Sequence, residues 1–125
     1  MVSMNIYKEH ILDLYKNPNN KGNLENPTHE FSKNNPLCGD EIKIQIIIKK
    51  NKISEIKFGG YGCVISQVSA SLLTDKIKNL SINKIKKISE EDVLKMLHIP
   101  ISLTRLKCAL LPLDAIKGAL ENAGN

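Results

Sequence analysis

Three cysteines and one aspartate are the residues of this chain best suited to bind a metal. Cys38 and Asp40 are separated by a single glycine, Cys63 follows a stretch with three glycines in four residues, and Cys108 comes 45 positions after Cys63. Three sulfurs and one oxygen match a tetrahedral zinc site, and three cysteines with a further ligand match an iron–sulfur cluster. The chain has no C-x-x-C pair, which argues against a zinc ribbon or a thioredoxin-like redox site.

The expected positions of these cysteines favour a shared site over simple burial, which is common for free cysteine. We expect Cys38 in a tight loop before a strand, Cys63 between a strand and a helix, and Cys108 at the start of the last helix. Ends of elements can converge, and a helix N-terminus favours the thiolate form. We therefore predict that the three sulfurs and Asp40 meet at one point. If such a site passes a bound group on to an acceptor, its thiolates must be exposed.

The elements that must position these side chains begin with a helix and a sheet. Residues 5–16 carry apolar side chains at helical spacing, and the Asn-, Pro- and Gly-containing segment 17–22 ends that helix. Residues 41–50 alternate between isoleucine and polar side chains, which is typical of a half-buried strand. Flanking strands are expected at 29–32 and 53–58, the latter with Ile56 and Phe58 on one face, followed by a flexible link over the glycines at 59–62.

The rest of the chain reads as helices. One is expected over 64–79, with Ser69 on its apolar stripe, and two short helices follow, with Ser81 and Ser89 as N-caps. The second of these spans 90–98. A last helix is expected over about 103–122, with a kink or break at Pro112. Strands followed by helices predict an α+β fold, in which helices pack on one face of a three-stranded antiparallel sheet.

The composition is that of one globular domain over residues 1–125. Hydrophobic content is 42% and charged content 25%, which argues against disordered and coiled-coil proteins. The net charge of +5 comes from scattered lysines with few aromatic residues, so nucleic-acid binding is not expected. There is no apolar run of membrane-spanning length and no secretory signal, and an odd number of cysteines makes no disulfide framework. We expect a cytoplasmic protein that does not bind membranes.

Three segments of the chain resemble the signature segments of NifU-like iron–sulfur cluster scaffolds, the IscU and SufU types. They are Asn35–Asp40, Gly60–Ser66 with Ser69–Ser71, and Arg105–Ala109. The resemblance extends from about Tyr7 to Leu120 and implies the same α+β sandwich. It also implies that Cys38, Cys63 and Cys108 hold a transient [2Fe–2S] cluster, or Zn²⁺ in its place, with Asp40 as the acidic neighbour.

The resemblance further implies a cysteine desulfurase as sulfur donor and apo iron–sulfur proteins as acceptors. Cys108 is the expected sulfur acceptor, and Lys107 beside it would stabilise the thiolate. Such a protein is a scaffold rather than an enzyme, and a monomer or weak homo-oligomer. Two alternatives stay open: a SufU-like zinc-dependent sulfurtransferase that activates a desulfurase, and a zinc-stabilised interaction domain without sulfur chemistry.

The subtype stays open because the chain combines features of both types. IscU-type proteins have histidine just before the third cysteine, where this chain has Lys107. The Arg105-x-Lys107-Cys108 pattern looks more like SufU, yet SufU proteins carry an insertion between the second and third cysteines. The spacing between Cys63 and Cys108 leaves no room for that insertion.

Overall fold

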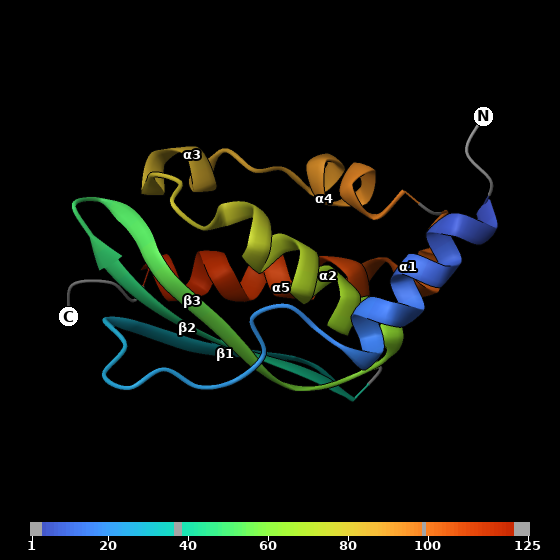
Figure 1. Cartoon of the computed structure of the whole chain (residues 1–125), viewed down its shortest axis with the longest axis horizontal. Coiled ribbons are helices and arrows are strands. Elements are labelled where there is room, and N and C mark those ends of the chain that lie inside the picture. The colour runs from blue at the N-terminus through green and yellow to red at the C-terminus, as the bar shows by residue number, and fades with distance from the viewer. Residues whose placement is uncertain (1–3, 37–38, 99, 122–125) are drawn as a thin grey trace.

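Helices and strands follow one another in the predicted order (Figure 1). The computed structural model describes residues 4–36, 39–98 and 100–121. The elements are α1 (Met4–Lys16), β1 (His29–Asn35), β2 (Asp40–Lys49), β3 (Lys52–Tyr61), α2 (Val64–Ile77), α3 (Ile82–Lys86), α4 (Glu90–Leu97) and α5 (Leu103–Glu121).

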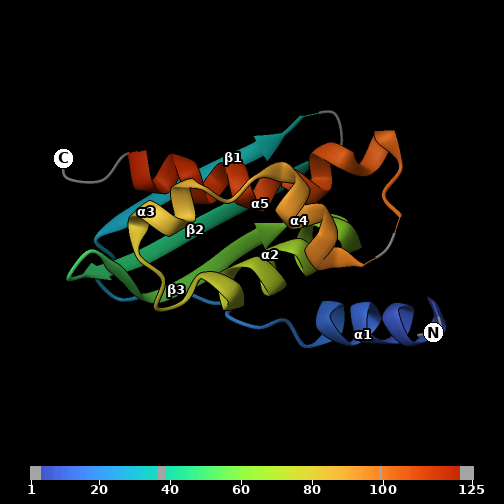
Figure 2. The same ribbon diagram turned by 90° about the horizontal axis from the view of Figure 1, so that it is seen from above.

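The strands form one antiparallel sheet in the order β1-β2-β3, and helices cover one of its faces. Helix α5 packs on β1 and β2, while α2 packs on β3 and lies beside α5 (Figure 2). Helices α1 and α4 contact α2 from further out. The predicted α+β fold, with its three-stranded antiparallel sheet, is confirmed.

The alternation of isoleucines in β2 produces the core as predicted, with one local exception. The fully buried isoleucines of this strand are Ile42, Ile44 and Ile46. Between Ile47 and Ile48 the register of β2 against β3 shifts, so that Ile48 lies opposite Ile53. This irregularity lets Ile53 and Ile56 both face the core although they are three residues apart. If side chains alternated strictly between the two faces of the sheet from Ile56 back to Ile53, Ile53 would point to the face opposite the core.

Strand β3 is longer than predicted and runs through the glycines toward Cys63. Residues 59–61 pair with β2, with Gly60 opposite Ile42. Gly60 has a φ of +106°, and a Cβ there would lie 2.0 Å from the carbonyl oxygen of Glu41. The prediction of a flexible link over 59–62 is therefore wrong for 59–61. Glycine serves here for a close approach of two strands, which carries the chain in a paired strand to within two residues of Cys63.

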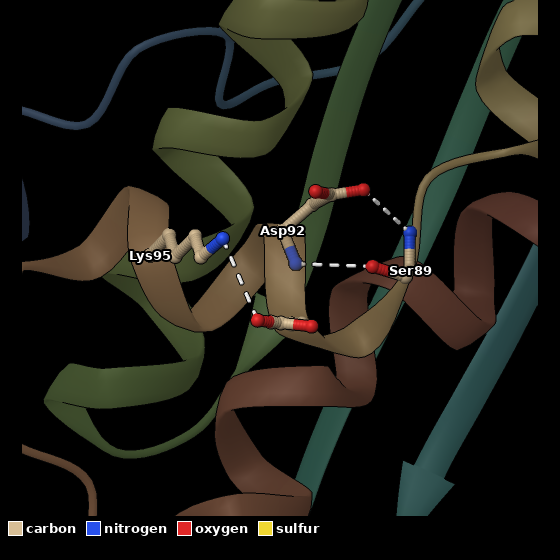
Figure 3. A network of polar contacts seen from close by, with 4 residues as sticks. Ser89, Asp92 and Lys95 are labelled. Atoms are coloured by element: carbon tan, nitrogen blue, oxygen red, sulfur yellow. Dashed lines mark hydrogen bonds and ion pairs between the residues drawn. The ribbon is translucent and has the colours of Figure 1, made fainter.

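Both predicted serine N-caps are present. The Ser81 Oγ accepts a hydrogen bond from the Lys84 backbone N–H at 3.3 Å. At the start of α4, the Asp92 N–H donates to Ser89 Oγ at 3.2 Å, and the Ser89 N–H donates to Asp92 Oδ2 at 2.9 Å (Figure 3). This reciprocal pair is a capping box. The Ser89 N–H bond holds the pKa of Asp92 below its ordinary value.

Helix α5 continues through Pro112 as one helix, so of the predicted kink or break, the break does not occur. Buried residues lie on both sides of the proline, and tertiary packing supplies most of the stability of such a helix. Because α5 begins at Leu103, Cys108 lies in its second turn. The prediction that Cys108 opens the helix is therefore wrong.

No helix in the part of the chain that the structure describes combines the length and apolar character needed to cross a membrane.

Candidate metal centre

The connection between β1 and β2 delivers the acidic residue of the site. Asp40 is the first residue of β2 and pairs with Asn35, the last residue of β1. The Gly39 N–H donates to the Asn35 carbonyl at 2.9 Å, and Gly39 has a φ of +73°, which favours glycine. Asp40 is only 2% exposed, so its carboxylate points into the molecule. Cys38 lies in this connection, outside the described residues.

Cys63 occupies the junction between β3 and α2, as predicted. It is the N-cap residue of α2, with φ −73° and ψ 170°, and its side chain makes no capping hydrogen bond. The sulfur is thus available for other partners. A Cβ on the preceding Gly62 would lie 2.4 Å from Ser66 Oγ and 2.9 Å from Asp40 Cγ. Glycine at 62 therefore leaves the space in which the Asp40 side chain sits.

Cys108 completes a group of three potential ligands. One ligand atom from each of Asp40, Cys63 and Cys108 lies within 4.8 Å of the others. The Cys63 thiol donates to Asp40 Oδ2 at 3.7 Å. The predicted convergence is confirmed for these three residues, which come from a strand start, a helix N-cap and the second turn of another helix.

The spacing of Cys63 and Asp40 is close to that of two ligands of a single tetrahedral ion. Zinc binds sulfur at about 2.3 Å and oxygen at about 2.0–2.2 Å, so tetrahedral ligands lie about 3.5 Å apart. The distance of 3.7 Å between Cys63 Sγ and Asp40 Oδ2 is close to that value. Within the described residues, no histidine joins a group of three or more potential ligands.

Burial in the site differs from expectation. Cys63 is half-buried, but Cys108 is 0% exposed. The expectation of exposed thiolates is therefore wrong for Cys108, because α5 places it on its packed side rather than at a free helix end.

Lys107 lies beside the site rather than in the group of ligands. It is exposed and lines a cavity of about 370 Å³ together with Leu111 and Asp114 of α5 and residues 33–36. Successive helix residues are rotated by about 100°, so the side chains of Lys107 and Cys108 leave α5 in different directions. Stabilisation of the Cys108 thiolate by Lys107 stays a prediction.

Two serines of α2 donate hydrogen bonds to backbone carbonyls at or next to the two described cysteines, and neither bond was predicted. Ser66 Oγ donates to the Cys63 carbonyl at 3.1 Å, and Ser69 Oγ donates to the Ala109 carbonyl at 2.6 Å. Both serines are fully buried. For Ser69 the sequence did contain a signal, a hydroxyl on the apolar stripe of a helix, since buried hydroxyls are nearly always hydrogen-bonded.

Comparison with known proteins gives one consistent family. The family described as NifU-like N terminal domain matches residues 6–123. The chain is 36% identical over 125 residues to the iron-sulfur cluster assembly enzyme IscU of Drosophila melanogaster, covering 97% of this chain and 80% of that protein. It is 33% identical over 120 residues to the iron-sulfur cluster assembly scaffold protein IscU of Escherichia coli K12, covering 93% and 92%.

Solved structures agree with these matches. A crystal structure described as that of an iron-sulfur cluster assembly scaffold protein for the SUF system, from Fervidobacterium islandicum AW-1, superposes with a TM-score of 0.77. The identity is 27%, and the alignment covers 95% of this chain and 99% of that one. A nitrogen-fixing NifU-like protein from Brucella abortus shares the fold, with a TM-score of 0.77 at 17% identity and coverage of 94% and 93%.

Proposed function

The chain belongs to the NifU-like N-terminal domain family, and on that basis we propose that it is an iron–sulfur cluster assembly scaffold. The observation that carries the proposal is the convergence of Asp40, Cys63 and Cys108 ligand atoms within 4.8 Å. Cys38 precedes Asp40 by two positions and completes the proposed ligand set. The [2Fe–2S] cluster is the cargo of this site, and the family match supports a single domain over residues 1–125.

Sulfur would enter through Cys108. Its thiolate attacks the outer sulfur of a persulfide on the partner desulfurase, a new S–S bond forms on Cys108, and the desulfurase cysteine leaves as a thiolate. Conversion of this sulfur to sulfide takes two electrons from an external reductant, and iron is supplied as Fe²⁺. Because Cys108 is fully buried, the desulfurase must meet an opened form of the site.

Asp40 would make the cluster transferable. A carboxylate is a harder and weaker partner for an iron–sulfur cluster than a thiolate, so the oxygen corner exchanges more easily. Asp40 is the first residue of β2 and lies beside Cys63, which suits a ligand that an acceptor cysteine replaces.

A second candidate function is that of a zinc-dependent sulfurtransferase that activates a desulfurase. The observation that favours it is the 3.7 Å spacing of Cys63 Sγ and Asp40 Oδ2, which suits one tetrahedral ion. In this function Zn²⁺ occupies the same four residues, and Cys108 still accepts the persulfide sulfur.

Anaerobic reconstitution with Fe²⁺, cysteine, a cysteine desulfurase and a thiol reductant such as dithiothreitol, which supplies the electrons for sulfide formation, tests both functions. Visible absorption bands with two irons and two sulfides per cluster, followed by transfer to an apo-ferredoxin, support the scaffold. A colourless protein with stoichiometric zinc that accelerates the desulfurase supports the second function. A protein with no effect on the desulfurase and no cluster contradicts both.

A further inference from the structure

One buried hydrogen bond ties together the two helices that carry the described cysteines. Ser69 Oγ donates to the Ala109 carbonyl at 2.6 Å, and both residues are 0% exposed. Ser69 lies on α2, whose N-cap is Cys63, and Ala109 directly follows Cys108 on α5. The bond therefore links the segment that holds one sulfur to the segment that holds the other.

The turn of α5 that carries Cys108 has a particular need for such support. Pro112 lies four residues after Cys108, within the helix. Proline has no backbone N–H, so residue 112 cannot donate to the carbonyl of Cys108, and its ring crowds that carbonyl. Helices bend at proline for this reason. The series of i→i−4 hydrogen bonds in α5 is thus interrupted in the turn that carries the Cys108 sulfur.

We infer that Ser69 is a positioning residue for the metal site, holding the Cys108 turn of α5 at a fixed place relative to Cys63 and Asp40. The inference rests on the proposed function, since it takes these residues as ligands. A backbone carbonyl can accept two hydrogen bonds, so Ser69 can hold Ala109 from outside without displacing a helical bond. Metal sites depend on contacts of this kind, which orient the ligands without touching the metal.

Ser71 offers a matched control on the same helix. It is also 0% exposed, but its Oγ accepts a hydrogen bond from the Asn19 backbone N–H at 2.6 Å. Ser71 therefore ties α2 to the segment after α1 rather than to α5. Ser69→Ala and Ser71→Ala remove the same atom from the same helix at the same burial. Only the first change releases the Cys108 turn.

The experiment is an anaerobic Co²⁺ titration of the reduced full-length chain, followed by competition with Zn²⁺. Absorption from thiolate–Co²⁺ charge transfer and from d–d bands reports how many sulfurs bind and in what geometry. Ser69→Ala should weaken Zn²⁺ binding about tenfold and shift the d–d bands, as loss of an orienting contact does. Ser71→Ala should melt at a lower temperature and keep the wild-type bands and affinity.

A second pair of variants tests the role of the proline. Pro112→Ala restores an N–H at position 112, so the Cys108 turn no longer depends on Ser69. In the Pro112→Ala background, Ser69→Ala should weaken Zn²⁺ binding less than about threefold, well short of the loss in wild type. Ser69→Thr, which keeps the hydroxyl, should retain the wild-type bands and serves if Ser69→Ala fails to fold.

Several outcomes overturn the inference. Unchanged Co²⁺ bands and Zn²⁺ affinity in Ser69→Ala contradict it, and so do equal losses in Ser69→Ala and Ser71→Ala, which indicate a general loss of stability. If Ser69→Ala weakens Zn²⁺ binding as much in the Pro112→Ala background as in the wild type, the argument from proline is contradicted. If the wild-type chain binds Co²⁺ without thiolate bands, its cysteines are not ligands, which contradicts the proposed function and the inference together. If the wild-type chain shows thiolate bands and only the result for Ser69→Ala differs from expectation, the inference alone is contradicted.

Discussion

The thiol of Cys63 lies 3.7 Å from Oδ2 of Asp40, although the two residues are 23 positions apart in the sequence. The contact exists because β2 begins where β3 ends: Glu41, next to Asp40, pairs with Tyr61, two residues before Cys63. Gly62 leaves room for the Asp40 side chain between the two. Antiparallel pairing of β2 and β3 therefore creates this part of the site.

Replacing Asp40 should separate its role as a ligand from a structural role. In Asp40→Ala, Zn²⁺ binding should fall at least about a hundredfold, because loss of a ligand costs no less than loss of a residue that orients one. Transfer of a [2Fe–2S] cluster to an apo-ferredoxin should slow, since the labile oxygen corner is gone. Zinc competition and transfer kinetics measure these effects.

The control for Asp40→Ala is Asp75→Ala, which removes an exposed carboxylate from α2. It should leave zinc affinity and transfer unchanged. Unchanged transfer in Asp40→Ala together with a lower melting temperature of the apo protein would make Asp40 structural and remove it from the ligand set.

Gly62→Ala should distort the site by steric clash alone. The new Cβ would lie 2.4 Å from Ser66 Oγ and 2.9 Å from Asp40 Cγ, so Asp40 must move. We expect destabilisation by about 1–3 kcal/mol, as for other overpacked positions, and weaker Co²⁺ binding with shifted bands. Gly59→Ala is the matched control, since a Cβ there meets nothing within 4 Å. Equal behaviour of the two variants would refute the packing argument.

Cys108→Ser should abolish sulfur acceptance and leave the fold intact. Serine is close to cysteine in size, and the site is assembled by β2, α2 and α5 together rather than by this thiol. Mass spectrometry after treatment with a desulfurase should find persulfide on Cys108 in the wild type and none in the variant. Persulfide found only on Cys38 or Cys63 would transfer the acceptor role to that residue.

The capping box of α4 predicts a pH effect that is independent of the metal site. The Ser89 N–H lowers the pKa of Asp92 in the folded chain, so the ionised carboxylate stabilises the fold at pH values above its ordinary pKa of 3.8. This stabilisation is lost as the pH falls through the lower, folded-state pKa. Asp92→Asn should therefore flatten the acid limb of the stability profile, measured by urea unfolding between pH 2 and 6.

Loss of the cap itself should lower stability without touching the site. Ser89→Ala should cost about 1 kcal/mol at neutral pH, the usual cost of removing a serine N-cap. Co²⁺ bands should be those of the wild type. Altered bands in this variant would show that α4 and the metal site are coupled.

Much of this molecule follows from local patterns in its sequence. Alternating isoleucines predicted β2, helical spacing predicted α1 and α2, and serines marked the starts of α3 and α4, because strand and helix periods act over a few residues. The Cys38, Cys63 and Cys108 segments, with Asp40, also sufficed to predict the family. The convergence of the described members of this set is confirmed, while Cys38 lies outside the described residues.

Other features depend on contacts between distant segments, which no local pattern contains. Ile53 is buried because the register of β3 shifts against β2, and Gly60 lies in a strand because Glu41 approaches it closely. Packing on the sheet and α2 keeps α5 continuous at Pro112, where proline alone predicts a kink or a break, and buries Cys108 in its second turn. In the sequence, Ser69 is one more residue of an apolar stripe. Its hydrogen bond to the Ala109 carbonyl exists only because α5 packs against α2. The sequence thus determined which residues could form the site, and packing of α5 against α2 and the sheet decided how they are held.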